Sequence, residues 1–112
     1  MHFVKSVIWV GGSKEDLMAF PATACREAGF QLDKAQHGHD PDNWKPMQTV
    51  GPGVREIRIR DAAGAFRVIY VTTFPDAVYV LHAFQKKPRR TAQRDLDTAA
   101  QRLRELRQGR RG

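Results

Sequence analysis

Apolar and polar residues alternate through the middle of the chain. Residues 54–60, VREIRIR, change character at nearly every step, which is the period of a strand with two different faces. Residues 66–73 and 78–84 are apolar runs that each contain two valines. The DAAGA segment before residue 66 and the FPDA segment between the two runs are typical of turns. We therefore predict three consecutive antiparallel strands. The first should carry Val54, Glu56, Arg58 and Arg60 on one face and Arg55, Ile57 and Ile59 on the other.

The N-terminal third predicts one strand and two helices. Residues 3–10, FVKSVIWV, are a β-branched and aromatic run that ends at two glycines. A short helix is expected to start with Ser13 as its cap and to run to about Phe20. Pro21 suits the first turn of a second helix. That helix would bury a thin apolar stripe of Cys25, Ala28, Leu32 and Ala35.

The remaining segments predict a loop and a final helix. Residues 37–53 contain repeated glycine and proline, which favours a loop. Residues 91–106 return to helical spacing, with Thr91 as a possible cap. Residues 107–112 are expected to be a frayed tail. The buried face of this helix would hold Leu96, Ala99, Ala100, Leu103 and Leu106.

These elements predict a single α+β domain over residues 1–112. Its sheet would be small, four-stranded and mostly antiparallel, with two N-terminal helices after the first strand and a C-terminal helix laid on the sheet. A chain of 112 residues is long enough for one core and too short for two.

Charge is distributed unevenly along the chain. The formal net charge is +7, yet residues 1–54 hold 5 Lys/Arg against 6 Asp/Glu, whereas residues 55–112 hold 14 against 6. The asymmetry favours a surface that faces a polyanion, with nucleic acid ahead of an anionic membrane. The alternative is that these cations only keep a small protein soluble.

Several classes of protein are not indicated. No apolar run approaches the roughly 20 residues that span a bilayer, and the N-terminus does not resemble a signal peptide. The single cysteine, Cys25, fits a reducing compartment, so we expect a cytoplasmic protein. His37 and His39 lie near two aspartates, but this spacing is more typical of a polar loop than of a metal site. We expect neither a metal nor a cofactor.

Ionisable residues inside the predicted strands are the candidates for chemistry. Cleavage of RNA by its own 2′-OH needs a base, an acid and cations for the phosphorane oxygens. Glu56 or His82 could serve as base or acid, and the phosphate could be held by Arg58, Arg67, Lys86 and Lys87. Two alternatives stay open: the charged row of residues 54–60 could be a solvated surface, and His82 could be a structural tether.

Trp44 and Lys45 join an aromatic ring to a cation just before the basic strand. A base stacked on Trp44 with a phosphate at Lys45 would suit single-stranded RNA. The alternative is that Trp44 packs as a lid on the core.

In combination, "DNWKPM", "VREIRIRD…FRVIY" and "LHAFQKK" closely resemble phage-derived HigB-like toxins of the RelE/ParE superfamily, over most of the chain from Trp9 to about Leu106. The resemblance implies an endoribonuclease that cleaves mRNA in the ribosomal A site, and a helix-turn-helix, HigA-like antitoxin as partner. RelE itself tends to have a lysine at the place of Glu56, so the general base is left open. The basic site carried over by the resemblance comprises Arg55, Arg58, Arg60, Arg67, His82, Lys86 and Lys87, with Arg89 and Arg90 at its periphery.

Two other functions share these features. A ParE-like inhibitor of DNA gyrase would have the same fold without the nucleolytic site. A non-catalytic module that binds RNA or an antitoxin would need only the cations.

Overall fold

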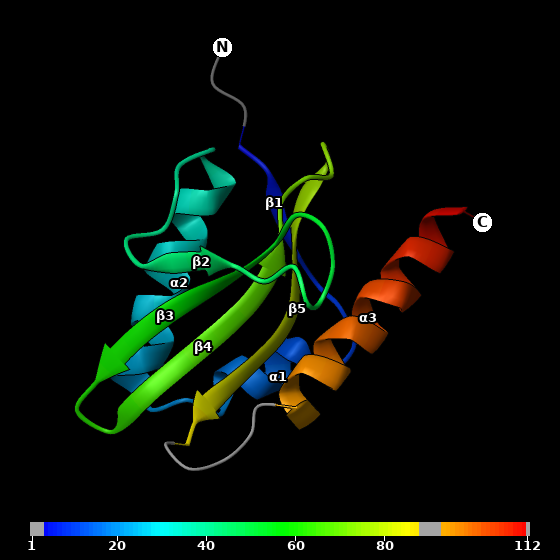
Figure 1. Cartoon of the computed structure of the whole chain (residues 1–112). Coiled ribbons are helices and arrows are strands. Elements are labelled where there is room, and N and C mark those ends of the chain that lie inside the picture. Colours follow the sequence, from blue (N-terminus) through cyan, green and yellow to red (C-terminus); the bar gives the residue numbers. More distant parts are fainter. Residues whose placement is uncertain (1–3, 88–92, 112) are drawn as a thin grey trace.

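The computed structural model describes residues 4–87 and 93–111 (Figure 1). Five strands and three helices follow one another along this part of the chain. Their order is β1 (Ser6–Trp9), α1 (Ser13–Met18), α2 (Ala22–Gln36), β2 (Trp44–Pro46), β3 (Val54–Asp61), β4 (Gly64–Val71), β5 (Ala77–Lys86) and α3 (Gln93–Arg111).

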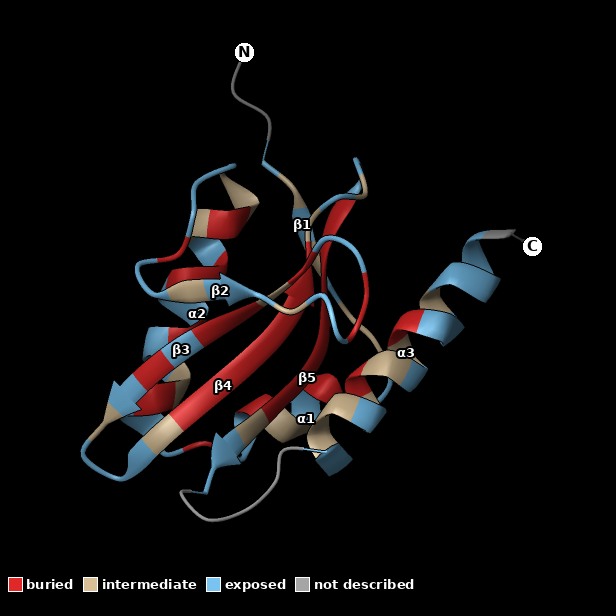
Figure 2. Cartoon of the chain, in the orientation of Figure 1, coloured by how far each residue is buried: buried red, intermediate tan, exposed pale blue. Residues whose placement is uncertain are grey.

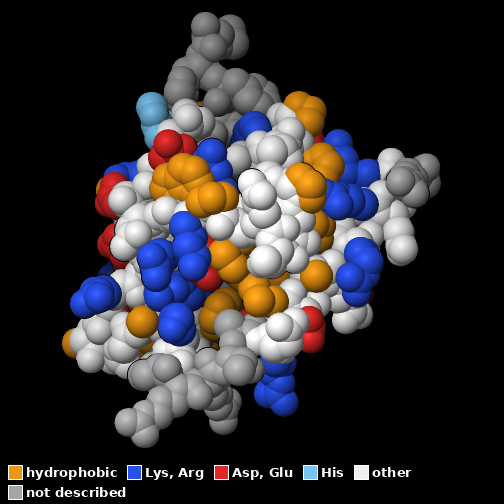
Figure 3. All heavy atoms as spheres, in the orientation of Figure 1, with side chains coloured by type: hydrophobic (Ala, Val, Ile, Leu, Met, Phe, Trp, Pro, Cys, Tyr) orange, Lys and Arg blue, Asp and Glu red, His pale blue; other side chains and the backbone are white. Residues whose placement is uncertain are grey.

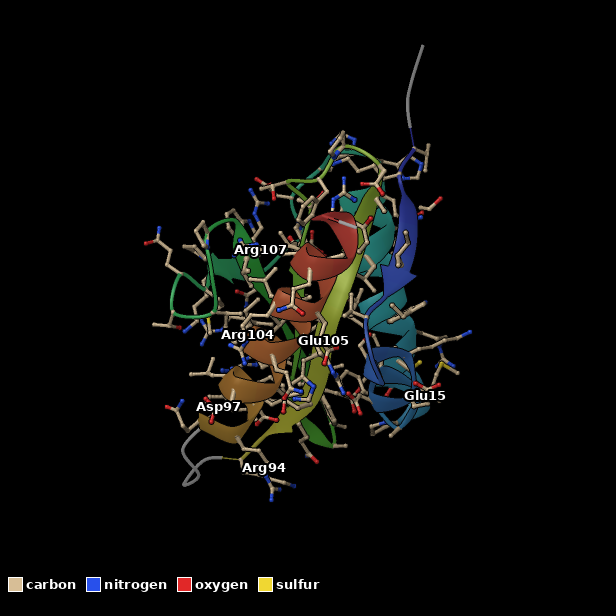
Figure 4. The ribbon with its side chains drawn as sticks, turned by 90° about the vertical axis from the view of Figure 1, so that its right-hand side faces the viewer. Glu15, Arg94, Asp97, Arg104, Glu105 and Arg107 are labelled. Atoms are coloured by element: carbon tan, nitrogen blue, oxygen red, sulfur yellow. The ribbon has the colours of Figure 1, made fainter. Side chains whose placement is uncertain are left out.

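The strands form one mixed sheet in the order β1-β5-β4-β3-β2. The antiparallel meander of β3, β4 and β5 confirms the prediction from the alternating residues. Gly64 has a φ of 133° in the tight turn between β3 and β4, a conformation that only glycine adopts readily. Helices α1 and α2 lie on one side of the sheet and α3 lies on the other (Figures 1 and 4).

The predicted four-stranded, mostly antiparallel sheet needs two corrections. The sheet has five strands, because residues 44–46 pair with β3 as an antiparallel edge strand. Proline is tolerated at such an edge, so Pro46 did not exclude a strand here. In addition, β1 pairs with β5 in parallel. Local periodicity carries no information about the direction of a partner so distant in sequence.

The sheet separates two hydrophobic clusters (Figure 2). On one side α2 buries Ala24, Ala28, Leu32 and Ala35 against the strands, and the ring of Phe20 lies 4.7 Å from that of Phe66. Cys25 is only partly buried, so Ala24 takes the place expected for it in the stripe. On the other side α3 contributes the predicted face, with Ala99 and Leu103 fully buried and Leu96, Ala100 and Leu106 partly buried.

Two predictions about helix ends were wrong. Ser13 is the first residue of α1 and not its cap: its fully buried hydroxyl donates to the Val80 carbonyl at 2.9 Å. Residues 107–111, which were expected in a frayed tail, continue α3 to Arg111. Arg110 anchors this last turn, with its guanidinium 3.1 Å from Asp76 Oδ1 and 4.5 Å from the centre of the Phe74 ring. The predicted cap, Thr91, lies outside the described residues.

Candidate functional site

Strand register brings the candidate side chains into rows on the face of the sheet that α3 only partly covers. Paired residues in neighbouring strands project from the same face, with Cβ atoms roughly 5 Å apart. One such row crosses β2 to β5 and two cross β3 to β5: Lys45, Glu56, Ile69 and His82; Arg58, Arg67 and Phe84; and Arg60, Ala65 and Lys86. Residues between Lys45 and Lys86 that lie far apart in sequence therefore share one surface.

Glu56 lies at the centre of a group of cations. Its side chain is only 8% exposed, and its Oε1 is 3.5 Å from Arg67 Nε, 3.9 Å from Arg58 Nε and 4.0 Å from Lys45 Nζ. All three separations exceed hydrogen-bond length, so these contacts are ion pairs without tight hydrogen bonds. We call Lys45, Arg58, Arg60 and Arg67, together with Glu56, the cationic cluster. Donors that are not saturated by a carboxylate remain able to bind another anion.

Arg67 is the most buried cation of the cationic cluster. It is 8% exposed, and its Nη1 donates to the Phe66 carbonyl at 3.1 Å. Burial lowers the pKa of the Arg67 guanidinium, the charge of Glu56 opposes that shift, and the repulsion of Arg58 and Arg60 adds to it. One carboxylate therefore does not balance the positive charge here, and an incoming anion would relieve the repulsion.

A hollow opens beside these side chains at the β3–β4 end of the sheet. Its volume is about 550 Å³, and Asn43, Arg58, Arg60, Gly64, Ala65 and Arg67 are among the residues that line it. Figure 3 shows Lys and Arg side chains gathered over this part of the surface. Sequence reasoning missed Asn43, because only the pairing of β2 with β3 brings this loop residue to the hollow.

His82 belongs to a second cluster. Its Nε2 is 2.8 Å from Asp95 Oδ1 on α3, and its Nδ1 is 3.3 Å from Asp16 Oδ2 on α1. Arg102 of α3 donates to both Asp16 and the Leu81 carbonyl at 2.9 Å. We call Asp16, His82, Asp95 and Arg102 the helix-anchoring cluster. With both ring nitrogens engaged by carboxylates, His82 ties β5 to the two helices, and this geometry favours the tether over a role in proton transfer.

Trp44 and Lys45 separate to opposite faces. Because they lie in a strand and not in a loop, neighbouring side chains point to opposite sides. Lys45 joins the cationic cluster, whereas Trp44 lies under the Arg55 guanidinium, 3.9 Å from the ring centre, on the α2 side. Arg55 also pairs with Asp40 at 2.8 Å. Trp44 and Arg55 therefore lie on the opposite face of the sheet from Arg58 and Arg67, and not on the predicted RNA-binding surface.

The two lysines at the end of β5 also differ in position. Lys86 occupies the row of Arg60, on the face of the cationic cluster. Lys87 instead donates to the Gln85 side chain at 3.1 Å, and Gln85 reaches the Ala63 carbonyl. Arg89 and Arg90 lie outside the described residues, so their predicted place at the periphery stays a prediction.

The fold and this surface define a small α+β protein with an open cationic face. A family model for phage-derived Gp49-like proteins (DUF891) matches residues 15–104, which include α2, the strands β2 to β5, the first part of α3 and every residue of the cationic cluster. The chain belongs to this family. A search of curated proteins found no significant match. No helix in the described part of the chain is long and apolar enough to cross a membrane.

Proposed function

We propose that this protein is the toxin of a type II toxin–antitoxin system and acts as an endoribonuclease on mRNA in the ribosomal A site. Membership of a phage-derived family and the resemblance of its motifs to HigB-like toxins support the class. The observation that supports the nuclease activity is the position of Glu56, whose carboxylate is nearly buried and lies among cations on an open face. A surface used only for solubility would not need a carboxylate desolvated at its centre.

The geometry supports a separate role for each of these residues in the reaction. Glu56 would take the proton of the 2′-OH as that oxygen attacks the adjacent phosphorus. The P–O5′ bond would then break to leave a 2′,3′-cyclic phosphate, and the departing 5′-oxygen would take a proton from water. Arg58 and Arg67, in neighbouring strands and both beside Glu56, would hold the phosphate and stabilise the phosphorane oxygens. Lys45 and Lys86 would bind the flanking backbone.

A protein partner is part of the proposal. We expect a helix-turn-helix antitoxin that binds the toxin and blocks it. Its target would then be the surface that carries the cationic cluster, or a surface that controls access to it.

Mapping of 5′ ends on a reporter mRNA after brief induction in bacteria tests the proposed function. We expect new ends inside translated codons with the natural chain and none with Arg67→Ala. Arg26→Ala is the matched control, since it removes one exposed cation from α2 on the opposite side of the sheet.

Other outcomes would replace the proposal. Arrested growth with intact mRNA would indicate another target, with DNA gyrase tested next by supercoiling assays. Normal growth with intact mRNA would leave a binding module. Thermal melting of both variants separates loss of activity from loss of fold.

A further inference from the structure

The end of β3 after Arg58 lies at a free edge of the sheet. β2 pairs only with residues 55–57 of β3, and the Arg58 amide donates to the Asn43 carbonyl at 2.8 Å just beyond. Met47 donates to the Val54 carbonyl, so the even-numbered residues of β3 direct their backbone groups toward this edge. The amide and carbonyl of Arg60 therefore point to the same edge. In the described part of the chain no strand lies opposite them.

Two hollows flank this free edge, one on each face of the sheet. The hollow of about 550 Å³ lies on the face of Arg58, Arg60 and Arg67. The second, of about 350 Å³, is lined on the α2 side by Thr23, Glu27, Gln31 and Asp42. Both hollows share Asn43 and residues 58–61. A strand added at this edge would send alternate side chains into the two hollows.

The two hollows differ in charge: the first holds cations with too few carboxylates to pair with, and the second holds carboxylates that already have partners. In the first, Glu56 is the one carboxylate among the described residues that forms ion pairs with Arg58 and Arg67, and Arg60 forms no ion pair with a described residue. This hollow therefore suits a carboxylate.

In the second hollow the carboxylates are already engaged. Asp42 accepts from Gln31 and pairs with Lys34, Glu27 accepts from Gln31, and Asp61 accepts from Thr23 at 2.5 Å. This hollow suits a small polar side chain without charge.

We propose that residues 58–61 receive an extended acidic peptide segment of a partner as an additional strand. Backbone hydrogen bonds to Arg60 would hold the segment, and its acidic side chains would lie on Arg58 and Arg67. Because those arginines belong to the cationic cluster, the bound segment would cover the surface that takes the phosphate. This last consequence rests on the proposed function, whereas the strand pairing does not.

A titration with a short peptide in which glutamate alternates with threonine tests the strand pairing. In the natural chain we expect slower amide hydrogen exchange at Arg60 when the peptide is present at millimolar concentration. Arg60→Pro removes the outward amide and is compatible with an edge strand. Arg60→Ala loses the same guanidinium and keeps the amide. We expect the proline variant to bind about fivefold more weakly than the alanine variant, the effect of one backbone hydrogen bond.

Three results would overturn the inference: equal binding by the two variants, no change at Arg60 with peptide, or protection of Arg60 by a short RNA and not by the peptide. If Arg60→Pro does not fold, a peptide N-methylated at alternate residues serves instead. It keeps its charge and loses its donors, so it should bind the natural chain more weakly. Peptide binding is measured without RNA. A chain that binds peptide and cleaves no mRNA would contradict only the proposed function, and the reverse result only the strand pairing.

Discussion

At the scale of the residue, burial distinguishes the candidate site from an ordinary charged surface. Arg58 is exposed, but Glu56 and Arg67, with backbone and side chain taken together, are only 6% and 8% exposed, and their nearest charged atoms lie 3.5 Å apart. Their charges are costly to bury unless each compensates the other. Removal of one charge should therefore affect both stability and RNA binding.

Glu56→Gln keeps the shape of the side chain and removes its charge. We expect a loss of about 1–3 kcal/mol in the free energy of unfolding, because Arg67 is left buried without its anion. Affinity for RNA should rise, since a negative charge leaves the surface, while cleavage should be lost with the base. Urea denaturation and binding of a non-cleavable RNA measure the two effects.

The matched control is Glu15→Gln, which neutralises an exposed carboxylate on α1. It should change neither stability nor cleavage measurably. If Glu56→Gln cleaves mRNA at the natural rate, Glu56 is not the base and its role is to position Arg67.

At the scale of the element, the loop before β3 depends on glycine. Gly53 has a φ of 79°, and a Cβ at this position would lie 2.6 Å from Thr73 Cγ2. This loop leads the chain from the edge strand β2 into β3, so its conformation helps to hold Lys45 beside Glu56.

Gly53→Ala should therefore lower the free energy of unfolding by more than the roughly 1–2 kcal/mol of an unfavourable backbone conformation alone. Gly38→Ala is the control, because Gly38 has a similar φ of 81° with nothing within 4 Å of the added Cβ. Chemical denaturation of both variants isolates the steric contact with Thr73. Equal losses would show that this contact is relieved without cost.

At the scale of the whole molecule, the fold places the excess cations of the second half of the chain on one side of the sheet. The cationic cluster lies on the side of the sheet that carries α3, where Arg104 and Arg107 are also exposed (Figure 4). The opposite side is covered by α1 and α2, from the half of the chain with no excess of cations. RNA should therefore approach from one side.

Binding of a non-cleavable RNA should weaken steeply with salt, with the logarithm of affinity falling linearly with the logarithm of salt concentration. Arg58→Ala should reduce the slope by about 1, as expected for one lost phosphate contact. Arg26→Ala, on the far side, should leave the slope unchanged. Filter binding over a series of salt concentrations measures all three slopes, and equal reductions would contradict a one-sided surface.

Sequence alone determined the elements with strong periodicity. The alternation in residues 54–60 predicted both the strand and the shared face of Glu56, Arg58 and Arg60, because a strand has a period of two whatever its partners. Helical spacing likewise predicted the buried face of α3. Which side chains of a strand share a face is therefore a local property.

Only the tertiary structure decided which of these side chains meet. Pairing with β3 turned residues 44–46 into a strand and separated Trp44 from Lys45. The packing of α1 and α3 on β5 enclosed His82 between two aspartates. The ion pair between Arg110 and Asp76 holds the last turn of α3 against the turn that precedes β5. Each outcome depends on residues far apart in sequence, whose contact no local pattern records.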